Sequence, residues 1–274
     1  MFSPPREIDV ACALAKEAGA LLLSHFGHHG TVHRKDRQEP VTDADRLANA
    51  LIVTGLRRAF PGDWVLSEEE PDLPGRLSAE RVWMVDPMDG TEDFIQGETG
   101  FAVMIGLCEK NKPVLGVVYR PTTGTLYHAV RGVGAYLDGQ RIRVAATGDV
   151  LGARLVASRA HRSPMLDQVR SALHTRDEIN IGSVGLKVGL VAEGKRDLYV
   201  NPAGRSKLWD ACAPQAILEA AGGTLTDLDG RPLCYGGVDL ANRRGLVASN
   251  GLIHAPVMER LAPLLGGGAG PRAG

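Results

Sequence analysis

Apolar residues recur at helical spacing in two stretches near the start of the chain. The first pattern spans residues 8–26 and stops at Gly27, which predicts a helix that ends near this glycine. The second covers residues 47–56, and Thr42 or Asp43 stands where a helix N-cap is expected. The sequence therefore predicts two amphipathic helices before the first strand.

The middle of the chain changes to short apolar runs bounded by turn residues, which is the pattern of a sheet. The run at residues 82–85 predicts a buried strand, and Asp138-Gly139 predicts a hairpin turn. Further strands are predicted over residues 101–108, 114–119, 126–130, 135–137 and 141–144. The first half therefore combines two helices with a group of strands.

From about residue 148 onward, strands and helices alternate. Strands are predicted over residues 155–157, 179–181, 198–200 and 246–248, with a hairpin at 224–228. Helices are predicted over residues 165–173, 184–193 and 211–221, and a final helix runs through Leu265. We therefore assign the chain to the mixed α/β (α+β) class, with an α+β half at residues 1–147 and an α/β half at 148–265. The Gly-rich residues 266–274 are expected to form a disordered tail.

Composition narrows the class of protein. The chain has 274 residues, with 31 basic and 32 acidic side chains, so bulk charge gives it no attraction to a nucleic acid polymer or a membrane surface. No apolar run approaches membrane-spanning length, and the first residues lack the basic-then-apolar pattern of a signal segment. The four cysteines contain no C-x-x-C pair and fit reduced thiols. We expect a cytoplasmic protein without a membrane span, and a homodimer is compatible with the sequence.

Residues 86–91 (DPMDGT) carry the strongest chemical signal, because they follow the predicted strand at 82–85 directly. Ligands of open α/β sheets collect at the carboxyl ends of strands, and a helix that starts there offers free backbone N–H groups to a phosphate. Asp86 and Asp89 would repel a bare anion, but they can hold a divalent cation such as Mg²⁺ between themselves and the phosphate. The segment therefore predicts a metal-bridged phosphate site.

Two other acidic positions support this prediction. Glu68 to Glu70 follow the apolar run at residues 64–66, at another predicted strand exit. Asp210 precedes the helical stretch at 211–221 and is a candidate N-cap. Taken alone, the first group is typical of a solvated turn and the second of an ordinary cap. The metal prediction rests on the combination of all three.

The motifs at residues 41–45 (VTDAD), 68–69 (EE), 86–91 (DPMDGT) and 209–210 (WD), followed by EAAGG at 219–223, resemble those of the inositol monophosphatase superfamily in order and spacing. The resemblance runs from the first helix to about residue 250. It implies a layered αβαβα sandwich. It also implies a Mg²⁺-dependent and typically lithium-sensitive phosphomonoesterase that acts on a small phosphorylated metabolite.

The resemblance also implies roles for individual residues. The Mg²⁺ ligands would be Glu68, Asp86, the backbone carbonyl of Met88, Asp89 and Asp210. Glu68 would help to orient the attacking water, whereas Thr91 and Asp45 would form a hydrogen-bonded pair that holds and deprotonates it. The expected substrate contacts are Glu68, Met88, Asp89, Gly90, Thr91 and Asp210, with the backbone N–H groups of Gly90 and Thr91 on the phosphate oxygens.

Residues 182–187 (GSVGLK) resemble one branch of this superfamily, the bacterial 3'(2'),5'-bisphosphate nucleotidases. This implies hydrolysis of adenosine 3',5'-bisphosphate to AMP and phosphate by metal-activated water. Ser183 and Lys187, one helical turn apart, are then candidates for binding the second phosphate of the substrate. The alternative for these two residues is an exposed helix N-terminus with a solvated lysine.

Other functions stay open at this point. Residues 201–208 lack the glutamate that holds sugar hydroxyls in inositol phosphatases, and they also lack the usual arginine and glutamate of the nucleotidases, for which Arg205 and Lys207 are the available replacements. The alternative activities are inositol-1-monophosphatase and fructose-1,6-bisphosphatase. A non-catalytic regulator that binds metal or phosphate is a third alternative. The histidines at 25, 28, 29 and 33 are interpreted as solvated rather than as a metal site.

Overall fold

The computed structural model of the chain describes residues 5–27, 32–34, 40–159, 164–175 and 177–266. The tail predicted at 266–274 lies outside these residues, apart from Gly266, which ends the last helix. His28 and His29 of the histidine group also lie outside them. Of the other two, His25 ends the first helix and His33 belongs to a short strand.

Two helices form the first layer of the fold, α1 (Arg6–His25) and α2 (Asp43–Ala59). A short antiparallel pair, β1 (Val32–Arg34) and β2 (Pro40–Thr42), lies between them in the chain. Thr42 caps α2 through a capping box: its backbone N–H donates to Asp45 Oδ2 at 2.8 Å, and its Oγ1 accepts from the Asp45 N–H at 3.4 Å. The cap thus fixes Asp45 at the start of α2.

These helices cover one face of a seven-stranded sheet. Its strands, in spatial order, are β3 (Trp64–Ser67), β4 (Arg81–Asp89), β5 (Ala102–Glu109), β6 (Lys112–Arg120), β7 (Thr125–Val130), β8 (Gly134–Leu137) and β9 (Gln140–Ile142). Only β3 and β4 pair in parallel. Side chains alternate across the sheet, so that Trp83 and Val85 pack toward α1 and α2 while Met84 packs toward the middle helices.

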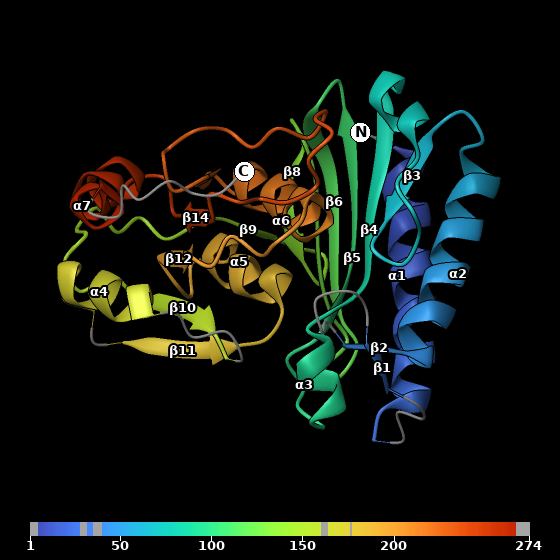
Figure 1. Cartoon of the computed structure of the whole chain (residues 1–274), viewed down its shortest axis with the longest axis horizontal. Coiled ribbons are helices and arrows are strands. Elements are labelled where there is room, and N and C mark those ends of the chain that lie inside the picture. Colours follow the sequence, from blue (N-terminus) through green and yellow to red (C-terminus); the bar gives the residue numbers. More distant parts are fainter. Residues whose placement is uncertain (1–4, 28–31, 35–39, 160–163, 176, 267–274) are drawn as a thin grey trace.

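The middle layer consists of α5 (Val184–Ala192) and α6 (Leu208–Ala220), which separate the two sheets (Figure 1). The second sheet has five strands in the order β11 (Glu178–Ile181), β10 (Leu155–Ser158), β12 (Leu198–Asn201), β14 (Leu246–Ser249) and β13 (Thr224–Thr226). Val156 and Tyr199 of this sheet pack in the core shared with α5 and α6. Leu155 and Leu198 face the opposite way.

The outer layer on that opposite side is formed by α4 (Pro164–Ala172) and α7 (His254–Gly266). Leu166 of α4 and Val257 of α7 pack there against the five-stranded sheet. Helices, sheet, helices, sheet and helices therefore follow one another across the molecule (Figure 1). The predicted αβαβα sandwich is confirmed.

Most predicted elements agree with the structure to within a few residues. The hairpin predicted at residues 224–228 is instead a single strand, β13, whose antiparallel partner β14 begins 20 residues after β13 ends. Two further differences lie near the site. The helix α6 begins at Leu208 with Lys207 as its N-cap, so Asp210 is the third residue of its first turn and not the cap. The strand β4 continues beyond the predicted residues 82–85 to Asp89, and the helix expected after it is formed as the five-residue α3 (Thr91–Ile95). The short strands β1 and β2 were not predicted, because three-residue strands carry too little periodicity to be recognised.

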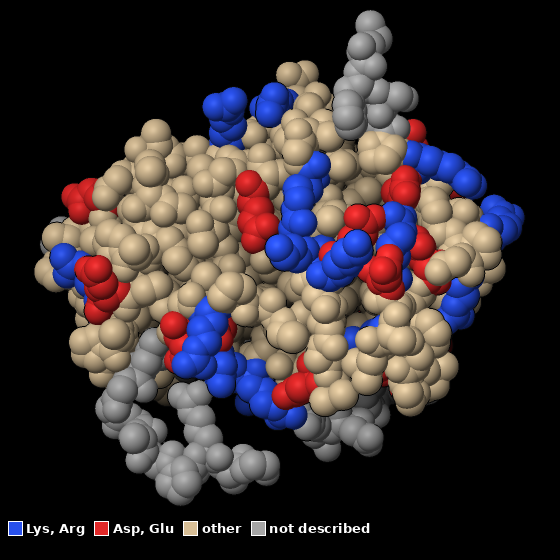
Figure 2. All heavy atoms as spheres, turned by 90° about the horizontal axis from the view of Figure 1, so that it is seen from above, with Lys and Arg blue, Asp and Glu red and all other residues tan. Residues whose placement is uncertain are grey.

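The distribution of charge on the surface and the character of the helices agree with the sequence, which has nearly equal numbers of basic and acidic residues. On the face shown in Figure 2, Lys and Arg side chains lie interspersed with Asp and Glu. Among the helices that the structure describes, none combines the length and the apolar character needed to cross a membrane.

Candidate metal and phosphate site

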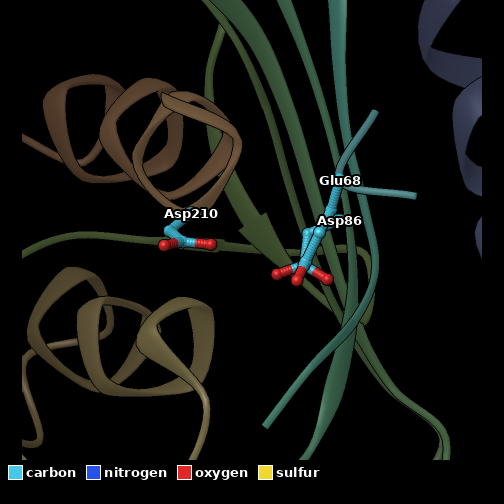
Figure 3. Close-up of side chains that lie close together, drawn as sticks. All are labelled: Glu68, Asp86 and Asp210. Atoms are coloured by element: carbon cyan, nitrogen blue, oxygen red, sulfur yellow. The ribbon is translucent and has the colours of Figure 1, made fainter. Parts of the chain in front are cut away.

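Three carboxylates from three elements converge at one point of the fold (Figure 3). Glu68 directly follows β3, Asp86 lies in β4, and Asp210 lies in the first turn of α6. One carboxylate oxygen of each lies within 4.8 Å of the others. Because β3 and β4 run in parallel, with Ser67 opposite Val85, their carboxyl ends bring Glu68 and Asp86 side by side. Figure 3 shows Asp210 approaching them from the helix on the other side.

A bulge in β4 separates the two aspartates of the DPMDGT sequence. Asp86 pairs with Met104 and Asp89 pairs with Ala102, so β4 has one more residue than β5 over this stretch. Pro87 cannot donate to the ladder, and the Met88 N–H instead donates to Asp86 Oδ1 at 3.0 Å. The bulge therefore anchors the Asp86 carboxylate while the strand continues to Asp89.

The electrostatics of the cluster favour a cation. Burial raises the pKa of Asp86 well above its usual range, and the charges of Glu68, Asp89 and Asp210 raise it further. The pKa of Asp210 is also raised, by burial and by Asp89 and Glu68, although the Lys207 N–H opposes this shift. Carboxylates that destabilise one another in this way, and that offer only hard oxygen ligands, fit Mg²⁺ well.

Asp89 lies beside this cluster and has a second set of contacts. Its Oδ2 accepts hydrogen bonds from Ser183 Oγ at 2.6 Å and from the Gly185 N–H at 3.0 Å, both at the start of α5. Burial raises its pKa, and the ammonium group of Lys187 opposes that shift. Asp89 therefore joins the exit of β4 to α5, and its role as a fourth carboxylate ligand stays a prediction.

The turn after Asp89 requires glycine. Gly90 has a φ of 97°, in the left-handed region. A Cβ atom there would lie 3.0 Å from the carbonyl oxygen of Gly100 and 3.3 Å from the Ser183 nitrogen. Gly90 thus turns the chain from β4 into α3 within a space that admits no side chain, and this places Thr91 at the start of α3.

The Thr91–Asp45 pair, which the family resemblance implies, is formed in the structure. Thr91 Oγ1 lies 3.3 Å from Asp45 Oδ1 and 3.1 Å from the carbonyl oxygen of Met88, which are alternative acceptors for its proton. The second oxygen of Asp45 accepts from both the N–H and the hydroxyl of Thr42, at 2.8 and 2.6 Å. Asp45 is buried, so these contacts fix its carboxylate relative to Thr91 although the two residues are 46 positions apart.

The contacts of Ser183 and Lys187 differ from both interpretations of the sequence. Ser183 is fully buried as the N-cap of α5, where its Oγ donates to Asp89 and accepts from the Leu186 N–H. Lys187 is 1% exposed, and its ammonium group donates to Ser158 Oγ, to the carbonyl oxygen of residue 181 and to that of residue 182, at 3.0, 3.2 and 2.7 Å. The alternative prediction, an exposed helix N-terminus with a solvated lysine, is therefore wrong.

The same contacts speak against binding of a second phosphate by this pair. All three N–H groups of the Lys187 ammonium have protein acceptors, and the Ser183 proton is used on Asp89. Burial lowers the pKa of Lys187 to about 8, with Asp89 and Asp93 opposing the shift. We correct the expectation accordingly: Lys187 connects the ends of β10 and β11 to α5.

Lys187→Met should therefore act mainly on stability. It removes the ammonium donor from three partly buried oxygens, and we expect the free energy of unfolding to fall by about 2–3 kcal/mol in urea denaturation. Lys112→Met is the matched control, because Lys112 is an exposed lysine at the start of β6. A selective loss of activity on bisphosphate substrates, with unchanged stability, would restore the original prediction for Lys187.

Asp93 lies in the first turn of α3, and its local sequence does not reveal how it packs. It is 1% exposed, its Oδ2 accepts from the Gly182 N–H at 3.1 Å, and Arg159 lies 3.8 Å away. A Cβ atom on Gly100 or Gly182 would collide with the Asp93 carboxylate. The two glycines are the signal of this close packing, but only the fold brings them next to Asp93.

Comparison with known proteins agrees with this arrangement. The model of the inositol monophosphatase family matches residues 5–264. The 3'(2'),5'-bisphosphate nucleotidase CysQ of Shigella flexneri is 37% identical over 235 residues, which cover 83% of this chain and 93% of the relative. A fructose-1,6-bisphosphatase/inositol-1-monophosphatase of Thermotoga maritima is 31% identical over 255 residues, covering 92% of this chain and 94% of that protein.

The fold agrees with solved structures as well. A Thermotoga maritima IMPase superposes with a TM-score of 0.84 at 28% identity, covering 95% of this chain and 98% of that one. Sequence motifs, layered fold and carboxylate cluster thus lead to the same assignment. The chain belongs to the inositol monophosphatase family.

Proposed function

We propose that this protein is a Mg²⁺-dependent phosphomonoesterase whose active site is the cluster of Glu68, Asp86 and Asp210. The observation that carries the proposal is the convergence of these three carboxylates within 4.8 Å, next to the turn that begins with Gly90. Phosphatase chemistry agrees with the family, which is one of phosphoric ester hydrolases. A phosphate is bound by N–H groups and cations, so three carboxylates can serve a phosphate only through a metal ion.

The residues that would hold Mg²⁺ are the three clustered carboxylates, with Asp89 and the Met88 carbonyl as the further ligands that the family resemblance implies. When bound, Mg²⁺ would neutralise phosphoryl charge and lower the pKa of a bound water. The bulge at Pro87 and the capping contact from the Lys207 N–H to Asp210 Oδ2 at 2.7 Å set the directions of two of these carboxylates. This pre-organises the site for a cation.

Thr91 and Asp45 supply the proton transfer in this proposal. A water held at Thr91 Oγ1 can pass its proton through that hydroxyl to Asp45 Oδ1, 3.3 Å away. The two hydrogen bonds from Thr42 keep the other Asp45 oxygen occupied, so Oδ1 is the oxygen that faces Thr91. The N–H groups of residues 90 and 91 would take oxygens of the phosphate as it is attacked.

For the substrate we propose adenosine 3',5'-bisphosphate, hydrolysed to AMP and phosphate. Support comes from the 37% identity to a bisphosphate nucleotidase and from the absence of an acidic side chain at residues 201–208, where inositol phosphatases bind sugar hydroxyls. With Lys187 buried, the positive charges nearest in sequence to Asp210 are Arg205, which is exposed, and Lys207, which is partly buried. These two are the candidates for the second phosphate.

A turnover comparison tests this substrate. At equal Mg²⁺, we expect kcat/KM for adenosine 3',5'-bisphosphate to exceed that for inositol 1-phosphate and fructose 1,6-bisphosphate by about tenfold or more, which is the value of one charge-assisted contact. Higher turnover of inositol 1-phosphate would favour the activity in the name of the Thermotoga relative. Metal binding without phosphate release from any of the three would favour a non-catalytic regulator.

Arg205→Ala offers a sharper test of the second phosphate. It should lower kcat/KM for the nucleotide by about tenfold and leave inositol 1-phosphate unchanged, because that substrate has no second phosphate for the guanidinium to bind. Arg231→Ala, an exposed arginine in the turn that follows β13, is the matched control. An equal fall with both substrates would assign Arg205 a structural role.

A further inference from the structure

Arg76 is a buried arginine that none of the motifs contains. It lies in a short 3-10 turn, η2 (Pro74–Ser78), and only 2% of its surface is exposed. Its guanidinium group binds both oxygens of Asp72, from Nε to Oδ1 at 2.8 Å and from Nη2 to Oδ2 at 2.9 Å. A buried charge of this kind is costly to keep unless it is fully bonded, and the guanidinium has further acceptors besides Asp72.

Those contacts reach a segment about 160 residues later in the chain. Nη2 donates to the carbonyl oxygen of Gly237 at 2.9 Å, and Nη1 donates to that of Tyr235 at 3.4 Å. Both belong to the loop between β13 and β14, of which residues 235–242 are here named the 235–242 loop. One planar guanidinium thus connects a carboxylate of the first half to backbone carbonyls of the second.

On the first side, the connection ends close to Glu68. Asp72 follows Glu68 by four residues, in the segment that leaves β3. The 3-10 turn also rests on Trp64, the first residue of β3, because a Cβ atom on Gly75 would lie only 2.6 Å from the Trp64 ring. Asp72 and Gly75 therefore fix Arg76 to the strand that ends immediately before Glu68.

On the second side, the connection ends at Asp210. The 235–242 loop binds the chain that enters α6: the Leu208 N–H donates to the Leu240 carbonyl at 2.9 Å, and Asn242 Nδ2 donates to the Lys207 carbonyl at 2.7 Å. The Tyr235 hydroxyl adds a bond to the Gln215 side chain, further along α6, at 2.7 Å. The loop thus holds the first turn of α6.

We propose that Arg76 is a positioning residue of the metal site, which fixes the segment of Glu68 relative to the first turn of α6 that carries Asp210. This inference rests on the proposed metal site. Arg76 belongs to neither the cluster nor its hydrogen bonds; it acts through Asp72 and the 235–242 loop. Metal affinity depends on how closely carboxylates from separate elements are pre-arranged, so loosening this connection weakens binding.

The test measures binding of Mn²⁺ alone to the metal-free full-length chain, by electron paramagnetic resonance of free Mn²⁺. We expect Arg76→Met, which keeps the length of the side chain but removes its donors, to raise the Mn²⁺ dissociation constant about tenfold. The matched control is Arg57→Met. Arg57 binds Glu70, in the same segment after β3, at 2.7 Å, but both partners lie in the first half, so Mn²⁺ affinity should stay unchanged.

A thermal melt of each metal-free variant separates positioning from simple stability. If Arg76→Met melts earlier but binds Mn²⁺ as the wild type does, Arg76 is only structural and the proposal is overturned. If Arg76→Met does not fold, Asp72→Asn replaces it; an increase of about threefold in the dissociation constant supports the proposal, and an unchanged constant overturns it. Arg76→Lys should bind Mn²⁺ more weakly than the wild type, because lysine cannot bond Asp72 and two carbonyls with one fork.

The same experiment distinguishes a failure of the positioning role of Arg76 from a failure of the proposed metal site. If the wild type binds no Mn²⁺, the proposed metal site itself is contradicted, and this inference with it. If the wild type binds Mn²⁺ and Arg76→Met binds it equally well, the metal site stands and only the positioning role is lost.

Discussion

Asp86→Asn is expected to lower the rate of Mg²⁺-dependent phosphate release by about a thousandfold or more, because it removes the central charge of the metal cluster. Asp86 is buried and lies next to the charges of Glu68, Asp89 and Asp210. The amide keeps an oxygen for the Met88 N–H, so the bulge in β4 should persist. The loss should appear in metal binding and in turnover together.

The same variant should be more stable than the wild type in metal-free buffer. Since the pKa of Asp86 is raised in the folded protein, its ionised form is destabilising at neutral pH, and removing the charge should increase the free energy of unfolding. Urea denaturation with a chelator present measures this. Asp167→Asn, at an exposed position in α4, is the control and should change neither quantity. Turnover near that of the wild type in Asp86→Asn would refute the assignment of the site.

Thr91→Val is expected to have the second largest effect, a fall in kcat of about a hundredfold, which is typical for loss of a group in proton transfer. Valine keeps the shape of threonine and removes only the hydroxyl that lies 3.3 Å from Asp45 Oδ1. The affinity for Mn²⁺ should stay the same, because the side chain of Thr91 is not among the three clustered ligands. Steady-state kinetics and Mn²⁺ binding, measured on the same preparation, check both statements.

Thr91→Ser is the matched control, since it keeps the hydroxyl and should retain most of the activity. If Thr91→Val weakens Mn²⁺ binding as much as it slows turnover, Thr91 supports the metal site and does not transfer a proton. An unchanged kcat would show that the Thr91–Asp45 pair has no part in catalysis.

The parts of this fold that could be predicted are the helices and strands whose own sequence shows the matching hydrophobic periodicity. The apolar stripes of α1 and α2 and the short runs of the sheet appear in the sequence with the right periods. Asp86 could be placed next to a buried strand because an apolar run leads directly to it, although the strand itself continues to Asp89. The acidic positions near Glu68 and Asp210 follow similar local signals, and the fold brings all three together.

The contacts that could not be predicted are those made between distant segments. A buried lysine such as Lys187 looks like a surface lysine in the sequence, because its acceptors on β10 and β11 approach it only in the folded chain. Asp210 was expected to be the N-cap of its helix. An aspartate is also favoured at the third helical position, three residues after the N-cap, where its carboxylate accepts from the N-cap N–H. Local sequence does not separate these two positions.

The contacts of Arg76 were even harder to predict from the sequence. Its partner Asp72 is four residues away and could have been paired with it as neighbours on a helix, but the carbonyls of the 235–242 loop carry no side-chain signal at all. A backbone acceptor can belong to any residue type. Connections of this kind can be found only once the two segments are placed next to each other.

Phosphate release from adenosine 3',5'-bisphosphate, followed while Mg²⁺ is added to metal-free protein, tests the central claim most directly. We predict no release above background without Mg²⁺, a rate that rises and saturates as Mg²⁺ is added, and no such rise in Asp86→Asn. A rate independent of Mg²⁺, or equal rates in the wild type and Asp86→Asn, would contradict the assignment of Glu68, Asp86 and Asp210 as the metal site of a phosphatase.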